Sequence, residues 1–101
     1  MTHSATIHWL APEQRGRKES PPTLRYVALS RFQEDGDHWP DGAWSIEVLF
    51  EEPPPEQERS DQSRGAVRFL FDTAPADRLC PGARFSLYEG PQKVADVEVL
   101  D

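Results

Sequence analysis

The feature that most constrains this chain is the segment WSIEVLF at positions 44–50, in which apolar and polar side chains alternate. The apolar residues that share one side of an extended chain here are Trp44, Ile46, Val48 and Phe50. Ser45 and Glu47 occupy the other side, and only Leu49 breaks the pattern. Because successive side chains of a strand point to opposite faces, a period of two predicts a half-buried β-strand. We therefore expect Trp44 in the core and Glu47 on an exposed face.

Five further segments have strand character. The alternating apolar residues in four of them are Ile7 and Trp9, then Val67, Phe69 and Phe71, then Phe85 and Leu87, and finally Ala95, Val97 and Val99. The segment 25–32 is also strand-like, although both of its faces are mixed. About six strands separated by turn signals predict an all-β fold, either an antiparallel barrel or a sandwich. Closure of a barrel would remove exposed strand edges.

A chain of 101 residues has room for one domain, so we assign residues 1–101 to a single unit. Two connections differ from the strands in composition. The segment 51–64 contains three consecutive prolines followed by polar residues, which predicts a mobile surface loop. The segment 33–42, QEDGDHWPDG, is rich in residues that favour turns, and it holds one large aromatic residue, Trp39.

The charge balance limits the classes of partner. The formal net charge is −7, from 18 acidic residues against 11 Lys and Arg, so phosphate backbones are repelled unless basic residues cluster on one face. The first ten residues lack a basic lead and an apolar run of secretory length, and no segment approaches the roughly 20 apolar residues that span a bilayer. A single cysteine, Cys80, agrees with a reducing compartment. We expect a cytoplasmic protein with no membrane partner.

Metal ligands are too few to predict a metal site. Zinc needs three or four converging ligands, but His3 and His8 fall on opposite faces of a strand, and the other candidates are His38 and Cys80. The spacing of Asp35, Asp37 and Asp41 resembles that of a calcium-binding loop. However, Trp39 occupies a ligand position, and Glu47 is one residue short of the position of the bidentate ligand. We expect no metal and no other cofactor.

No residue pattern predicts catalysis. Cys80 lies between Leu79 and Pro81 with only Arg78 as a basic neighbour, which favours an inert thiol. Glu47 and Glu51 share one strand face, but charge on an outward face usually serves solubility. We therefore name no catalytic residue.

The segment from Val67 to Leu100, VRFLFDTAPADRLCPGARFSLYEGPQKVADVEVL, resembles the last strands of the third, C-terminal β-barrel domain of translation elongation factor Tu. The residues that fall on the positions typical of that family are Pro75, Arg84, Phe85, Glu89, Gly90 and Val94. The upstream half is similar to the family in two respects. Gly16 and Arg17 match a Gly-Arg pair in the loop after the family's first strand, and Arg25 and Arg31 match the six-residue spacing of two arginines in its second strand.

This resemblance implies a six-stranded antiparallel β-barrel that stands alone. No phosphate-loop pattern with Gly-Lys-Ser/Thr occurs, so nucleotide binding is not expected. In the family, this barrel helps to hold transfer RNA and contacts other protein domains. The resemblance therefore implies that Arg17, Arg25 and Arg31 are candidate RNA-binding residues.

Two hypotheses of function follow, from different classes. The first is a protein-binding or adaptor module, with Trp39 as anchor and the nearby acidic residues Asp35, Asp37 and Asp41 steering a basic partner. The alternative is an RNA-binding accessory of translation that contacts transfer RNA through its arginines. An enzyme ranks third, because no nucleophile, base and oxyanion site converge in the sequence. Each surface feature also has a simpler interpretation. The basic residues can be ordinary solvated charges, and Trp39 can serve only to cap the end of the barrel.

Overall fold

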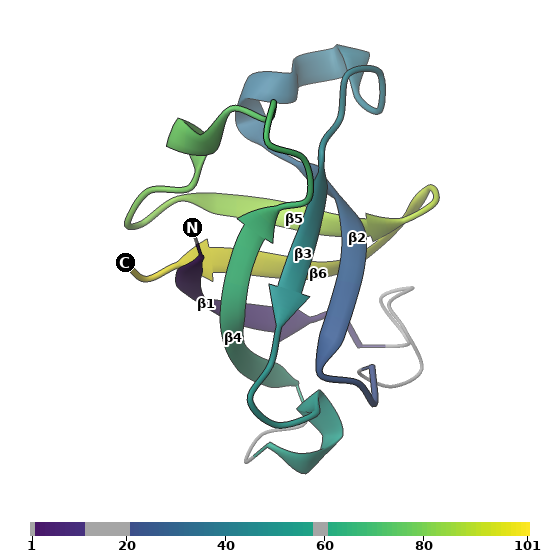
Figure 1. Cartoon of the computed structure of the whole chain (residues 1–101). Coiled ribbons are helices and arrows are strands. Elements are labelled where there is room, and N and C mark those ends of the chain that lie inside the picture. The colour runs from purple at the N-terminus through teal and green to yellow at the C-terminus, as the bar shows by residue number, and fades with distance from the viewer. Residues whose placement is uncertain (1, 12–20, 58–60) are drawn as a thin grey trace.

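The computed structural model describes residues 2–11, 21–57 and 61–101. Six antiparallel strands close into a barrel in the order β1-β4-β3-β2-β5-β6 (Figure 1). The strands are β1 (His3–Trp9), β2 (Arg25–Arg31), β3 (Ser45–Leu49), β4 (Gln62–Phe69), β5 (Arg84–Glu89) and β6 (Gln92–Val99). The predicted all-β fold is confirmed, and closure of the sheet selects the barrel over the sandwich. In the described part of the chain, no helix has the length and apolar character needed to cross a membrane.

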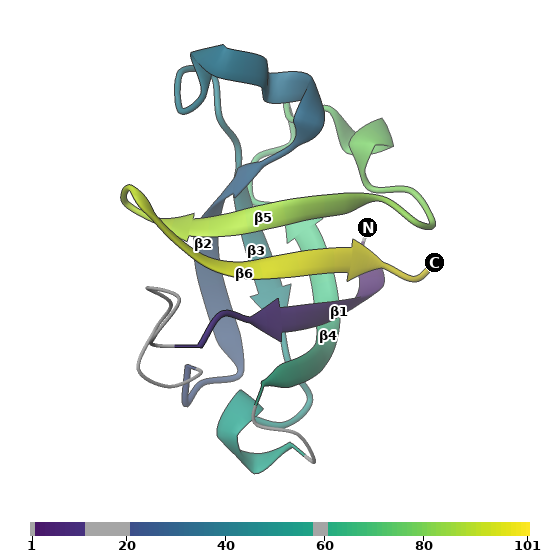
Figure 2. The same ribbon diagram turned by 180° about the vertical axis from the view of Figure 1, so that it is seen from behind.

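The barrel has two groups of strands. Figures 1 and 2 show β2, β3 and β4 side by side, while β5, β6 and β1 run across them on the opposite side. The groups are joined at two places. β1 pairs with β4 over six residues, from His3↔Val67 to His8↔Gln62. β2 pairs with β5 over only three, from Leu29↔Tyr88 to Arg31↔Ser86, which is the shortest pairing among the described strands.

The barrel interior is filled mainly by the side chains that the alternation predicted to point inward. The largest fully buried ones are Ile7, Ile46, Leu87, Val48, Val67, Val94, Val97 and Val99. Burying one such side chain stabilises the fold by about 1.5–3 kcal/mol. Phe32, just beyond β2, stacks on Phe85 with ring centroids 4.6 Å apart, and this stack closes one end of the core.

Two aromatic residues predicted to point inward lie outside the core. Trp44 is only half-buried, because β3 begins one residue later at Ser45. Phe71 is 57% exposed, because β4 ends at Phe69. The Leu70 N–H still bonds to the Ser45 carbonyl at 3.0 Å, but beyond that point the chain turns away. Once a strand has ended, its alternation no longer dictates the direction of a side chain.

A β-bulge in the last hairpin changes the side-chain register of β6. Leu87 pairs with Ala95 and Tyr88 pairs with Lys93, so Val94 is the extra residue on the bulged strand. Val94 and Ala95 are therefore both buried although they are neighbours in sequence. The same irregularity lies beside Tyr88, whose ring faces the outside of the barrel.

In the connections that the structure describes, the 3-10 helices are η2 (Gln33–His38), η3 (Pro54–Glu56) and η4 (Ala76–Arg78). η2 and η4 lie at one end of the barrel and η3 at the other (Figures 1 and 2). The prediction of a loop over 51–64 extends too far at its C-terminal end, because β4 begins at Gln62, and residues 58–60 of that segment lie outside the described residues. The start of β4 was not predictable from the alternation of apolar residues, because the first inward residue, Ser63, is polar. Ser63 is buried inside the barrel, where its hydroxyl accepts a hydrogen bond from the Trp9 indole N–H at 2.8 Å.

Candidate functional site

Trp39 belongs to a compact group of side chains on the outside of the barrel. Its ring lies 4.4 Å from the Tyr88 ring, centroid to centroid. The Arg31 guanidinium carbon is 5.2 Å from the Trp39 centroid, within the range of a cation–π contact. The indole N–H donates to the Ser30 carbonyl at 2.8 Å. We call Arg31, Trp39 and Tyr88 the Trp39 cluster.

The strands determine where the Trp39 cluster forms. Ser30 points inward and is fully buried, and its N–H and hydroxyl both donate to the Trp44 carbonyl. Arg31, the next residue, therefore points outward at the end of β2. Tyr88 pairs with Leu29, so its ring lies beside β2, where the two groups of strands meet. The loop after η2 brings Trp39 onto this junction.

The predicted acidic set around Trp39 is divided by the structure. Asp35 has a side chain only 7% exposed, and it accepts hydrogen bonds from the Phe32 N–H at 2.8 Å and from Arg78 Nη1 at 3.0 Å. It therefore joins η2 to η4 and serves the fold. Asp37 and Asp41 are exposed. Of the three predicted steering residues, these two present their charge to solvent.

The predicted basic set does not converge. Arg17 lies outside the described residues. Arg25 and Arg31 occupy opposite ends of the outer face of β2, roughly 20 Å apart for six residues at the usual rise of a strand. Arg31 contacts Trp39, and Arg25 forms an ion pair with Glu47.

Glu47 is the largest departure from the sequence-based expectation. It points outward as predicted, yet only 2% of the residue is exposed. Its carboxylate accepts the Nε–H of Arg25 from β2 and the Nε–H of Arg68 from β4, the latter at 2.5 Å. These hydrogen bonds, that from Arg25 first, hold the pKa of Glu47 below its ordinary value, although burial acts in the opposite direction. We call Arg25, Glu47 and Arg68 the Glu47 triad.

Sequence reasoning missed the Glu47 triad because its members are far apart along the chain. Arg68 lies directly opposite Glu47 in the β3–β4 register, and Arg25 lies diagonally opposite on β2. A glutamate on a polar strand face gives no sign of what covers it. Only the register of three strands together could have identified this site.

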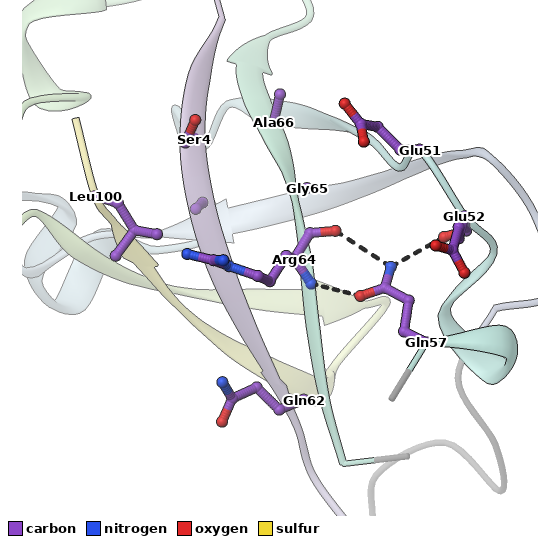
Figure 3. Close-up of a pocket in the computed structure, with 10 residues that line it drawn as sticks. Ser4, Glu51, Glu52, Gln57, Gln62, Arg64, Gly65, Ala66 and Leu100 are labelled. Carbon is purple, nitrogen blue, oxygen red and sulfur yellow. Dashed lines mark hydrogen bonds between the residues drawn. The ribbon is translucent and has the colours of Figure 1, made fainter. Parts of the chain in front are cut away.

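An open hollow of about 620 Å³ lies between the β1–β4 surface and the loop that follows β3 (Figure 3). Gln57 ties this loop to β4, because its side-chain amide bonds both the N–H and the carbonyl of Arg64 and also the Glu52 carbonyl. The Arg64 side chain extends away from Glu51 and Glu52, across β1 toward Leu100 (Figure 3). The hollow thus presents charges of both signs to solvent.

A row of outward residues on the other group of strands contains a serine, an aspartate and a histidine. Asp96 pairs with Ser86 on one side and with His8 on the other. The Ser86 hydroxyl donates to Asp96 at 3.0 Å, and Lys93 Nζ lies 2.9 Å from the same carboxylate. The carboxylate lies between the serine and the histidine, whereas a catalytic triad needs the histidine in the middle. This row therefore lacks the order of an activated nucleophile.

Within the described residues, no group of three or more His, Cys, Asp and Glu is arranged to hold a metal ion, and Cys80 is an exposed free thiol. The Trp39 cluster and the Glu47 triad are the candidate sites that we consider further. Comparison of the chain with protein-family models and with curated proteins found no match.

Proposed function

We propose that this protein is a non-catalytic, cytoplasmic protein-binding or adaptor module, built on a barrel of the kind found in the third domain of elongation factor Tu. The closed six-stranded antiparallel barrel is compatible with that domain type. The observation that carries the binding function is the Trp39 cluster, in which Trp39 contacts both Tyr88 and Arg31 on the barrel exterior. Tryptophan, tyrosine and arginine are the residues most enriched at the energetic centres of protein interfaces.

The Trp39 cluster is held in place before any partner arrives. The hydrogen bond from the indole N–H to the Ser30 carbonyl and the tilted packing against the Tyr88 ring fix the orientation of the Trp39 ring. Binding through a fixed side chain avoids the roughly 0.5–1.5 kcal/mol that ordering a flexible one would cost. The exposed carboxylates of Asp37 and Asp41 lie in the same loop and can steer a partner that presents basic groups near its anchor point.

Affinity recovery tests this function. The full chain carrying a tag is used to recover proteins from its own lysate, with and without ribonuclease, and the recovered protein is then purified for direct titration. We expect binding that survives ribonuclease and falls by about 30-fold or more for Trp39→Ala, as for an interface residue worth 2 kcal/mol. Trp44→Ala is the matched control, because Trp44 is half-buried at the same end of the barrel. Equal binding by native protein and Trp39→Ala would refute the anchor.

The transfer-RNA alternative has less support from the geometry. Arg25 and Arg31 lie far apart, and each is engaged by a neighbouring side chain within the barrel. Retention of transfer RNA on a native gel tests this alternative, with Arg17, Arg25 and Arg31 replaced together by Gln. Retention that disappears in this triple variant, together with ribonuclease-sensitive recovery, would assign the function to RNA binding instead.

A further inference from the structure

The charges of this acidic protein are unevenly distributed over the barrel. Strands β2, β3 and β4 carry four arginines and a single carboxylate, whereas the chain as a whole has a net charge of −7. The four arginines are Arg25, Arg31, Arg64 and Arg68, all on outward positions of β2 and β4. Exposed acidic residues lie beyond both ends of β3, at Asp37 and Asp41 on one side and at Glu51, Glu52 and Glu56 on the other. One side of the barrel is therefore basic and is bordered by acidic ends.

The Glu47 triad places two arginines in a fixed arrangement on this basic side. Each guanidinium has five N–H donors and gives its Nε–H to Glu47. No other hydrogen-bond partner of either guanidinium is found in residues 2–11, 21–57 and 61–101. The arginine side chains are 57% and 49% exposed, whereas the Glu47 side chain is 3% exposed. The triad thus carries a net positive charge, with its carboxylate covered and its remaining donors accessible.

Aliphatic side chains connect the Glu47 triad to the Trp39 cluster. Val27 and Leu29 are the outward residues between Arg25 and Arg31 on β2, and both are half-buried. Val27 pairs with Glu47, and Leu29 pairs with Tyr88. An apolar strip therefore runs along β2 from one group to the other, with an arginine at each end. This length of roughly 20 Å matches about six residues of extended chain.

We propose that this face binds an acidic segment of a protein partner, with a carboxylate held by Arg25 and Arg68 and apolar side chains lying along Val27 and Leu29 toward Trp39. The proposal rests on the protein-binding function and specifies the partner's chemistry at the end of the strip away from Trp39, where carboxylates face the Glu47 triad. The basic groups that Asp37 and Asp41 steer belong to the other end of the same partner, beyond Trp39. Arginine binds carboxylate through paired, charge-assisted hydrogen bonds, and two arginines oriented by one buried glutamate are suited to this. A polyphosphate chain fits less well, because it carries charge on every unit and would place that charge on the aliphatic surface of Val27 and Leu29, where a peptide can place apolar side chains.

Peptide selection tests this proposal without knowledge of the partner. The full-length protein is immobilised and used to select from a displayed library of random nine-residue peptides. The same selection is made with Arg25→Gln/Glu47→Gln/Arg68→Gln, which removes the triad charges without leaving an unpaired buried carboxylate. Arg84→Gln is the matched control, since Arg84 is 77% exposed on β5 and its nearest carboxylate is 3.8 Å away. Circular dichroism verifies that each variant is folded.

We expect peptides selected on the native protein to be enriched in Asp and Glu, and this enrichment to disappear on the triple variant. The best peptide, made synthetically, should lose at least 10-fold in affinity for the triple variant and less than 2-fold for Arg84→Gln. If the triple variant does not fold, Arg25→Lys/Arg68→Lys takes its place, with an expected loss of 3-fold or more because lysine cannot form the bidentate contact.

Any of three results would overturn the proposal. The selection could recover no acidic peptides, or the peptide could bind the native protein and the triad variant with equal affinity. A ten-nucleotide RNA could also displace the peptide at a lower concentration than the unlabelled peptide does.

A parallel selection on Trp39→Ala separates this proposal from the protein-binding function. Acidic peptides that persist on Trp39→Ala support the arginine site and count against the anchor. Peptides that depend on Trp39 but show no acidic preference support the anchor and refute the acidic partner.

Discussion

Replacing Glu47 by glutamine removes one charge from the middle of the Glu47 triad and leaves the side-chain volume almost unchanged. A hydrogen bond to a charged group contributes about 1.5–3 kcal/mol when it is buried. Exposed ion pairs contribute only about 0.2–1 kcal/mol. Because Glu47 is covered while Arg25 and Arg68 are about half exposed, the contribution of each pair falls between these ranges. Two such pairs contribute about 2–3 kcal/mol, and the glutamine side-chain oxygen can still accept a hydrogen bond from one arginine. We therefore expect Glu47→Gln to lower the free energy of unfolding at pH 7 by about 1–2 kcal/mol in total.

The same substitution has a characteristic pH dependence. Folding lowers the pKa of Glu47 because Arg25 and Arg68 bond its charged form. A carboxyl group whose pKa is lower in the folded state stabilises the fold fully above its unfolded pKa of about 4.3. This stabilisation is lost as the pH falls through the folded-state pKa. The difference in stability between native protein and Glu47→Gln should therefore be constant above about pH 5 and should shrink at lower pH.

Urea denaturation followed by tryptophan fluorescence measures this difference at pH 7, 5 and 3. At pH 7, the midpoint of thermal unfolding should also fall by roughly 5–15 °C, given about 4–8 °C per kcal/mol for a domain of this size. Glu98→Gln is the control, because Glu98 is 39% exposed and lies 3.8 Å from Arg84, so its effect should be within about 0.5 kcal/mol. Two results would refute the reasoning: a loss at pH 7 no greater than that of the control, or a loss that is the same at pH 7 and pH 3.

Two further substitutions probe the packing of β4. Gly65→Ala would place a Cβ atom 2.8 Å from the Leu49 carbonyl oxygen, so β3 and β4 must shift. We expect urea denaturation to show that the free energy of unfolding falls by about 1–3 kcal/mol. An unchanged free energy of unfolding would contradict this reasoning. Ser63→Ala leaves the buried indole N–H of Trp9 without its acceptor and should also cost about 1–3 kcal/mol. Ser86→Ala, on the solvent side of the barrel, should cost about 0.5 kcal/mol or less, and equal losses for the two serines would contradict this explanation.

The strands were predictable because their apolar residues repeat with a period of two and because each strand has one face toward a single interior. Ile46 and Val48 on β3 and Val97 and Val99 on β6 follow this rule without exception. Local alternation fails where a strand ends, as at Phe71. It also fails where a buried polar group is satisfied by a distant partner, and Ser63 bonds a tryptophan 54 positions away in sequence.

The candidate sites were only partly predictable, for a similar reason. Trp39 could be singled out as a large aromatic residue in a turn, but its contacts with Arg31 and Tyr88 depend on the junction of β2 and β5. Asp35 looked equivalent to its acidic neighbours, whereas its burial depends on Arg78 from another loop. Composition identifies the side chains that are available, and the strand register determines which of them meet.

The short pairing of β2 with β5 has a dynamic consequence. The backbone ladder between these strands covers only Leu29 to Arg31, and a side-chain hydrogen bond from the Tyr26 hydroxyl to Glu89 adds to it. The barrel should therefore open first at this seam, and the amide protons of this short ladder should exchange with solvent faster than those of the β1–β4 ladder. Trp39 spans the seam, since its indole bonds Ser30 on β2 and its ring packs on Tyr88 of β5. A molecule that seats on Trp39 would therefore slow amide exchange along the seam, and deuterium uptake there would report its arrival.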